Sequence, residues 1–137
     1  MAEAAPSSEF LVLSRGRWDE GATPERIESA IDAFYTWIEQ GIATGKMKTG
    51  QRLATGGRTV GREFVSDGPY GEAKEIIGGY WFIVARDLDE AQAIIAGNPC
   101  MALGLFFELR PVETVRASAY AVTNETPPGR GHAPSDR

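Results

Sequence analysis

The groups that could do chemistry lie mainly in the middle of the chain, where charged and aromatic residues separate two apolar runs. A carboxylate whose pKa is raised by burial can act as a general acid or base, and a tyrosine hydroxyl can assist it by hydrogen bonding. Asp67 is the candidate for this catalytic role, with Tyr70 or Tyr80 as its partner. The residues that could line a ligand site around it are Tyr70, Glu72, Lys74, Tyr80, Phe106, Glu108 and Arg110.

A structural role for Asp67 is the favoured alternative, because this residue starts a turn. Gly68 supplies backbone freedom, and Pro69 fixes its own φ. An aspartate in a turn usually accepts a hydrogen bond from the amide two residues on, but here that position is Pro69, which has no N–H. We therefore expect the Asp67 carboxylate to brace the turn through another donor. Glu72 and Lys74 are likewise expected to pair with neighbouring charges.

A spaced motif begins at this turn. It consists of Asp67-Gly68-Pro69-Tyr70, then Glu72, Lys74-Glu75 and Gly78-Gly79-Tyr80. With tyrosine in place of the usual phenylalanine, the motif resembles the signature of the DGPF proteins, a branch of the YCII-related family. The resemblance continues through residues 89–91, Pro99 and residues 108–112, and it covers residues 9–113. It implies a ferredoxin-like α+β domain that dimerises into an α+β barrel.

The resemblance also implies a function. Many DGPF proteins are encoded beside extracytoplasmic-function sigma factors, and some other YCII relatives are enzymes that use a histidine and an aspartate. The only histidine of this chain is His132, which falls in a predicted tail, so that pair cannot be carried over. The expected protein is a homodimeric small-molecule-binding or regulatory accessory protein with a functional link to a sigma factor. The alternative is a lyase- or isomerase-like enzyme that uses Asp67 as acid or base in the barrel pocket.

The single cysteine and the single histidine provide neither a metal site nor a nucleophile. Four-ligand zinc sites and catalytic triads need more of these residues than the chain contains. Cys100 follows a predicted helix end and has no basic neighbour in the sequence. We therefore expect its side chain to be a small buried hydrophobic group rather than a nucleophile. No cofactor and no metal are expected.

Length and charge limit the possible partners. The 137 residues fit one domain with a core of ordinary size. The formal net charge is −5 and no Lys/Arg cluster is present, which argues against a nucleic-acid partner. No apolar run reaches membrane-spanning length, and the first ten residues lack the pattern of a signal peptide. We expect a cytoplasmic protein with no membrane partner.

The most basic region precedes the motif. Its cations are Lys46, Lys48, Arg52, Arg58 and Arg62. They are spread out along the chain, so a solvated face is the favoured interpretation and the binding of an acidic ligand is the alternative. The glycines among them indicate turns, because neither a phosphate-loop nor a dinucleotide pattern is present.

Two helices are predicted from their capping residues. Thr23 and Asp87 are the expected N-caps, and the helices end at Gly41 and about Ala96. The apolar stripe of the first helix contains Ile27, Ile31, Phe34, Tyr35 and Ile38. Such a stripe could form a ligand surface, but helical spacing favours the core face of a helix.

Strands and turns complete a β-α-β-(β)-β-α-β order. Strands are expected over residues 10–13, 51–54, 59–65, 76–85 and 103–110, with a hairpin connection at 55–58 and a short helical turn or ordered loop at 69–75. This order predicts a ferredoxin-like β-α-β-β-α-β fold, with an antiparallel sheet and both helices on one face. Residues 1–8 are expected to be a flexible N-terminus, 9–122 the domain and 123–137 a disordered tail.

Both faces of the two strongest strands are apolar, which predicts a homodimer. One strand places Tyr80, Phe82 and Val84 on one face and Trp81, Ile83 and Ala85 on the other. The closing strand places Leu103, Leu105, Phe107 and Leu109 on one face and Phe106, Glu108 and Arg110 on the other. Two helices cover only one face of the sheet, so a second copy is expected to bury the face that carries Phe106. Glu108 and Arg110 would then lie at the rim of the shared barrel.

Overall fold

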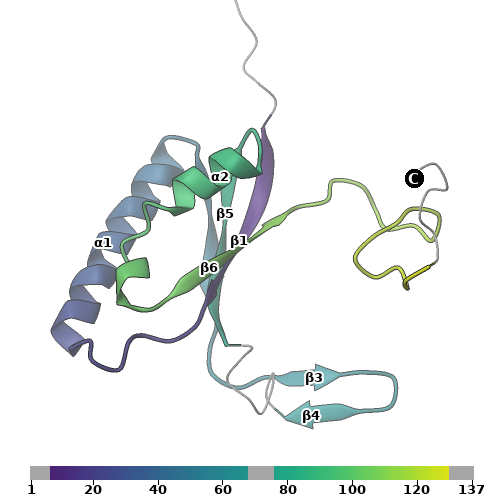
Figure 1. Cartoon of the computed structure of the whole chain (residues 1–137), viewed down its shortest axis with the longest axis horizontal. Helices are drawn as coiled ribbons and strands as arrows, with labels where there is room; N and C mark the ends of the chain where they lie inside the picture. The colour runs from purple at the N-terminus through teal and green to yellow at the C-terminus, as the bar shows by residue number, and fades with distance from the viewer. Residues whose placement is uncertain (1–6, 68–75, 130–137) are drawn as a thin grey trace, which may run out of the picture.

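A four-stranded antiparallel sheet forms the centre of the fold. The computed structural model describes residues 7–67 and 76–129. Its elements are β1 (Ser8–Arg15), α1 (Pro24–Ala43), β2 (Met47–Arg52), β3 (Arg58–Val60), β4 (Val65–Asp67), β5 (Ile77–Ala85), α2 (Leu88–Ile95), a 3-10 turn (Met101–Leu103) and β6 (Phe106–Pro111). The sheet order is β2-β5-β1-β6, and both helices lie on one side of it (Figure 1). The predicted ferredoxin-like α+β fold is confirmed.

The two helices begin where their caps place them. Thr23 Oγ1 accepts a hydrogen bond from the Arg26 amide at 3.2 Å, and proline occupies the first helical position of α1. Asp87 Oδ1 accepts from the Glu90 amide at 2.9 Å, while the Glu90 carboxylate accepts from the Arg86 amide at 2.7 Å. The capping box therefore reaches one residue further back than its usual partner, the N-cap amide.

The strand register explains which face is buried. Val12 pairs with Trp81 and Phe10 with Ile83, and all four side chains are buried beneath the helices. Ile38 of α1 together with Ala91 and Ile95 of α2 closes the core from the helix side. Because side chains alternate along a strand, the residues between them point to the opposite face of the sheet. We call that opposite side the open face.

The second strand was expected at residues 51–54, but β2 lies at Met47–Arg52. Only the Met47 side chain of β2 is buried, so the segment lacks the alternation of buried and exposed side chains that marks a strand in the sequence. Its pairing with β5 holds it as an edge strand. Gly50 makes the pairing possible, because a Cβ there would lie 1.9 Å from the Tyr80 carbonyl oxygen.

The expected hairpin connection at residues 55–58 was wrong, and so was the single strand over 59–65. β3 and β4 pair with each other in a separate two-stranded sheet, which projects away from the rest of the fold (Figure 1). Gly56 and Gly57, at φ 90° and 139°, let the chain leave β2. The turn of the hairpin lies instead at residues 61–64, where the Gly61 amide donates to the Phe64 carbonyl at 2.8 Å.

The closing strand begins later than the predicted residue 103. Leu103 is buried, but it belongs to the 3-10 turn, and its carbonyl accepts a hydrogen bond from the Asp19 amide at 2.7 Å. Gly104 then takes a left-handed conformation at φ 114°, which ends the turn before β6. The predicted helical turn at residues 69–75 lies outside the described residues.

Candidate functional site

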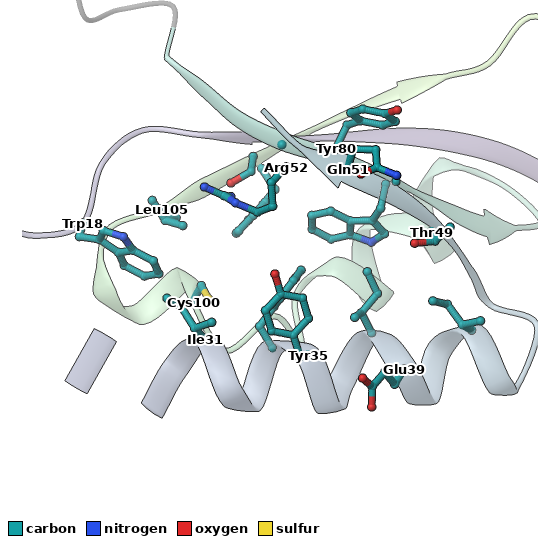
Figure 2. A pocket seen from close by; sticks show the side chains of 18 residues that line it. Trp18, Ile31, Tyr35, Glu39, Thr49, Gln51, Arg52, Tyr80, Cys100 and Leu105 are labelled. Carbon is teal, nitrogen blue, oxygen red and sulfur yellow. The ribbon is translucent and has the colours of Figure 1, made fainter. Parts of the chain in front are cut away.

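A cleft of about 500 Å³ lies between α1 and the sheet. Its volume is within the usual range for small-molecule sites. Figure 2 shows the cleft from close by, with α1 below and the strands above. The lining residues are Ser14, Trp18, Ile31, Phe34, Tyr35, Ile38, Glu39, Ile42, Thr49, Gly50, Gln51, Arg52, Gly79, Tyr80, Trp81, Cys100, Leu105 and Phe107.

Aromatic and aliphatic side chains make up most of the lining. Phe34 stacks edge-on against Trp81 with ring centroids 5.2 Å apart, and Phe107 contacts the same indole at 5.8 Å. Tyr35, the next residue along α1, is 45% exposed, and its hydroxyl points up into the cleft (Figure 2). Trp18, in the loop after β1, faces the cleft from one end. An apolar cleft with rings on several sides suits an apolar or aromatic ligand.

Arg52 is the cation of the cleft. At the end of β2 its side chain reaches toward the end where Trp18 and Leu105 lie (Figure 2). Within residues 7–67 and 76–129 its guanidinium makes no ion pair and no hydrogen bond. The carboxylate of Glu39 points away from the cleft on the far side of α1 (Figure 2).

Arg52 and Ser14 face the same point beside Gly78. A Cβ placed on Gly78 would lie 3.3 Å from Arg52 Nη1, 3.7 Å from Arg52 Nη2 and 3.8 Å from Ser14 Oγ. Ser14 is 8% exposed, and its hydroxyl makes no hydrogen bond within the described part of the chain. The Arg52 guanidinium and the Ser14 hydroxyl therefore lie next to the same point of β5, where Gly78 has no side chain.

Cys100 lines the cleft as a buried thiol. Burial raises the pKa of this thiol, and the positive charge of Arg52 offsets part of that rise. Its Sγ lies 3.7 Å from the Ala30 carbonyl oxygen, and its backbone amide donates a hydrogen bond to Asn98 Oδ1 at 2.7 Å. A protonated, buried thiol fits the expected small hydrophobe and is a poor nucleophile.

The open face carries a second group of charged residues. Arg15 Nη1 lies 2.5 Å from Glu108 Oε1, and Arg110 Nη1 lies 3.2 Å from Glu108 Oε2. The Arg15 guanidinium also stacks over the Phe106 ring at 5.7 Å from its centroid. Lys48 forms an ion pair with Glu9 on the same side of the sheet. These pairs flank apolar side chains rather than a cavity.

The structure separates the residues that the sequence grouped as one site. Tyr70, Glu72 and Lys74 lie outside the described residues. Asp67 ends β4, where its backbone pairs with that of Arg58, in the hairpin that projects from the fold. Phe106, Glu108 and Arg110 lie on the open face and do not line the cleft. Tyr80 borders the cleft, but its ring lies on the open-face side of the sheet, 6.1 Å from the Phe82 ring (Figure 2).

Sequence reasoning missed the residues that give the cleft its character. Tyr35 was assigned to the core stripe of the helix, where its neighbour Phe34 does belong. Arg52 appeared only as one of several spread cations, and Trp18 was not singled out at all. The available signal was the less favoured alternative for the basic region, the binding of an acidic ligand.

Two further properties concern metals and membranes. Within the described ranges, no group of three or more His, Cys, Asp or Glu side chains could hold a metal ion. In the same part of the chain, neither helix combines the length and the apolar character that crossing a bilayer requires.

Comparisons with known proteins complete the description. The family model of the YCII-related domain matches residues 9–115. Among solved structures, the 5-chloro-2-hydroxyhydroquinone dehydrochlorinase from Burkholderia phenoliruptrix AC1100, in complex with 2,5-dihydroxybenzoquinone, matches with 21% sequence identity and a TM-score of 0.37. That match covers 73% of this chain and 90% of the other. A comparison with curated proteins gave no match.

Proposed function

The chain belongs to the family of YCII-related domain proteins, and we propose that it is a homodimer that binds a small molecule in the cleft between α1 and the sheet. The cleft itself is the observation that carries this proposal. It has a volume of about 500 Å³, a mostly apolar lining and a small number of polar groups, among them Thr49, Gln51 and Arg52. This combination is the usual composition of a small-molecule site.

The homodimer is supported by the open face of the sheet. Leu11 pairs there with Phe82 and Leu13 with Tyr80, Val84 lies on the same face of β5, and the Phe106 side chain at the edge is 54% exposed. A contiguous apolar patch of this kind is unusual on a soluble monomer. A second copy packed sheet to sheet about a two-fold axis would cover it, with the charged pairs of Glu108 and of Lys48 around the rim.

A binding or regulatory role suits this chain better than catalysis in the cleft. The titratable groups in the lining are a raised-pKa thiol, a carboxylate that points away, an arginine and two tyrosines. General acid–base catalysis by Asp67 stays a prediction, as does the functional link to a sigma factor. Turnover assays on any compound that binds would separate a binding protein from a lyase or isomerase.

The proposed binding is tested by thermal shift with a panel of small aromatic and aliphatic compounds. We expect a subset to raise the Tm of the wild-type protein, because a ligand that binds only the folded state stabilises it. Tyr35→Ala removes a ring from the cleft and should weaken those ligands, while Tyr120→Ala is the matched control, since that ring is 97% exposed outside the cleft. Ile42→Trp, which would fill the other end of the cleft, should have a similar or larger effect than Tyr35→Ala. Binding that survives both cleft substitutions unchanged would contradict the proposal.

A further inference from the structure

The charged group of the cleft selects for a particular chemical class of ligand. The described lining contains two residues with formal charges, Arg52 and Glu39, and only the arginine reaches into the space. An arginine guanidinium presents two parallel N–H donors that match a planar carboxylate. Arg52 is the one cation of the described lining, so a ligand with a single negative charge matches it better than a doubly charged phosphate.

The Arg52 guanidinium is placed to bind a group of a ligand rather than another side chain of this chain. Both Nη atoms and Ser14 Oγ lie within 3.3–3.8 Å of the empty Cβ position of Gly78. Arg52 is exposed and has no ion-pair partner among the described residues, and the hydroxyl of Ser14, a residue that is 8% exposed, makes no hydrogen bond there. Both groups therefore keep their hydrogen-bonding capacity for water or for a ligand in the cleft. The charge also reaches the cleft interior, because Arg52 acts on the Cys100 thiol.

The rest of the cleft recognises the other end of the molecule. Trp18, Tyr35 and Leu105 surround the space next to the guanidinium (Figure 2). Deeper in the cleft lie the rings of Phe34, Trp81 and Phe107. Flat side chains at contact distance favour a flat ligand, because rings stack edge-on or offset against one another.

We infer that the ligand of the cleft is a small aromatic monocarboxylate, with its ring among Trp18, Tyr35 and Leu105 and its carboxylate on Arg52 and Ser14 beside Gly78. This inference rests on the proposed function, since it names the chemical class of the molecule that the cleft binds. It also assigns a role to Arg52, for which the sequence offered two interpretations, a solvated face and the binding of an acidic ligand.

The experiment compares matched pairs of ligands by calorimetric titration: benzoate with benzamide, and 2-naphthoate with 2-naphthamide. Each pair keeps the ring and removes the charge. We expect the carboxylates to bind the wild-type protein at least tenfold more tightly than the amides, because charge-assisted hydrogen bonds are the stronger kind. Arg52→Gln should abolish this difference, and Arg116→Gln, an exposed arginine outside the cleft, should preserve it.

A second pair of variants tests the geometry without changing charge. Gly78→Ala adds a methyl group at the point that Arg52 and Ser14 share, so it should weaken the carboxylates several-fold and leave the amides unchanged. Gly21→Ala is the control, because a Cβ there meets nothing within 4 Å.

The outcomes separate the two proposals. Amides that bind as tightly as their carboxylates would overturn the ligand class, and the proposed function would stand if Tyr35→Ala weakens both. Equal loss of amide and carboxylate in Arg52→Gln would also overturn the ligand class. The absence of binding by every compound in both panels would overturn both proposals.

Discussion

Arg15 Nη1 lies 2.5 Å from Glu108 Oε1 on the face of the sheet that the helices leave open. The two side chains come from neighbouring strands, and both are partly buried, at 17% and 33% exposure. The pair stands at the edge of an apolar surface, beside the exposed Phe106 ring over which Arg15 stacks. Polar groups around an apolar centre are typical of a protein–protein interface.

Phe106→Glu should disrupt the proposed homodimer. A carboxylate at this position would be placed against the apolar surface of the second copy without a partner, which costs several kcal/mol if it is fully buried. Light scattering on a sizing column at low micromolar concentration should report a dimer for the wild-type protein and a monomer or aggregate for the variant. Val115→Glu, an exposed apolar residue after β6, should leave the dimer intact. A wild-type protein that runs as a stable monomer would disprove the dimer.

Glu108→Gln should lower the free energy of unfolding by about 1 kcal/mol. The substitution keeps the shape of the side chain but removes the charge that pairs with Arg15 and Arg110, and partly exposed pairs contribute modestly. Denaturant titration at one fixed protein concentration measures the change. Glu63→Gln, whose only described partner Arg62 is 4.0 Å away and exposed, should change stability by less than about 0.5 kcal/mol. Equal effects of the two substitutions would contradict this account of the open-face pair.

Gly50→Ala should destabilise the fold by about 2 to 3 kcal/mol. The added Cβ would overlap the Tyr80 carbonyl oxygen at 1.9 Å, so β2 would have to move away from β5. Thermal unfolding should show a lower Tm, while Gly21→Ala should unfold like the wild-type protein. An unchanged Tm in Gly50→Ala would mean that β2 does not pair with β5 as described.

Cys100 should react slowly with iodoacetamide near neutral pH. Burial raises the pKa of its thiol, so the reactive thiolate is scarce, and its 4% exposure limits access. The positive charge of Arg52 lowers the pKa, so Arg52→Gln should raise it further and slow the reaction.

The same shift predicts the pH dependence of stability. The folded thiol has the higher pKa, so its contribution to stability is fully present below the pKa of the unfolded thiol and is lost as the pH rises through the pKa of the folded thiol.

Mass spectrometry after timed alkylation checks the predicted reactivity of Cys100. Faster alkylation of Arg52→Gln than of the wild-type protein, at equal stability, would show that Arg52 does not act on this thiol.

The sequence predicts strands best where both faces are apolar. β5 was placed within one residue because Trp81 and Ile83 alternate with Tyr80 and Phe82, and each set packs on its own side. β2 was misplaced because its single buried residue, Met47, gives no alternation, and its pairing partner is distant in the sequence. Local pattern cannot identify a strand that is held by its neighbour.

The candidate site was less predictable because it forms only in three dimensions. Arg52 reaches the cleft through the register that pairs it with Gly79, and Ser14 through the register that pairs it with the same glycine. Neither spacing is visible along the chain. The motif that starts at Asp67 did identify the family, but of its residues only Gly79 and Tyr80 border the cleft, and residues 68–75 lie outside the described ranges.

The most direct test of the central claim uses the three tryptophan indole N–H signals in a two-dimensional NMR spectrum. Trp18 and Trp81 line the cleft, whereas Trp37 faces Trp81 from outside it, at 6.1 Å between ring centroids. Titration with 2-naphthoate should shift the Trp18 and Trp81 signals in a saturable manner and shift Trp37 less. Saturable binding that leaves Trp18 and Trp81 unmoved, or that moves Trp37 alone, would contradict a ligand site between α1 and the sheet.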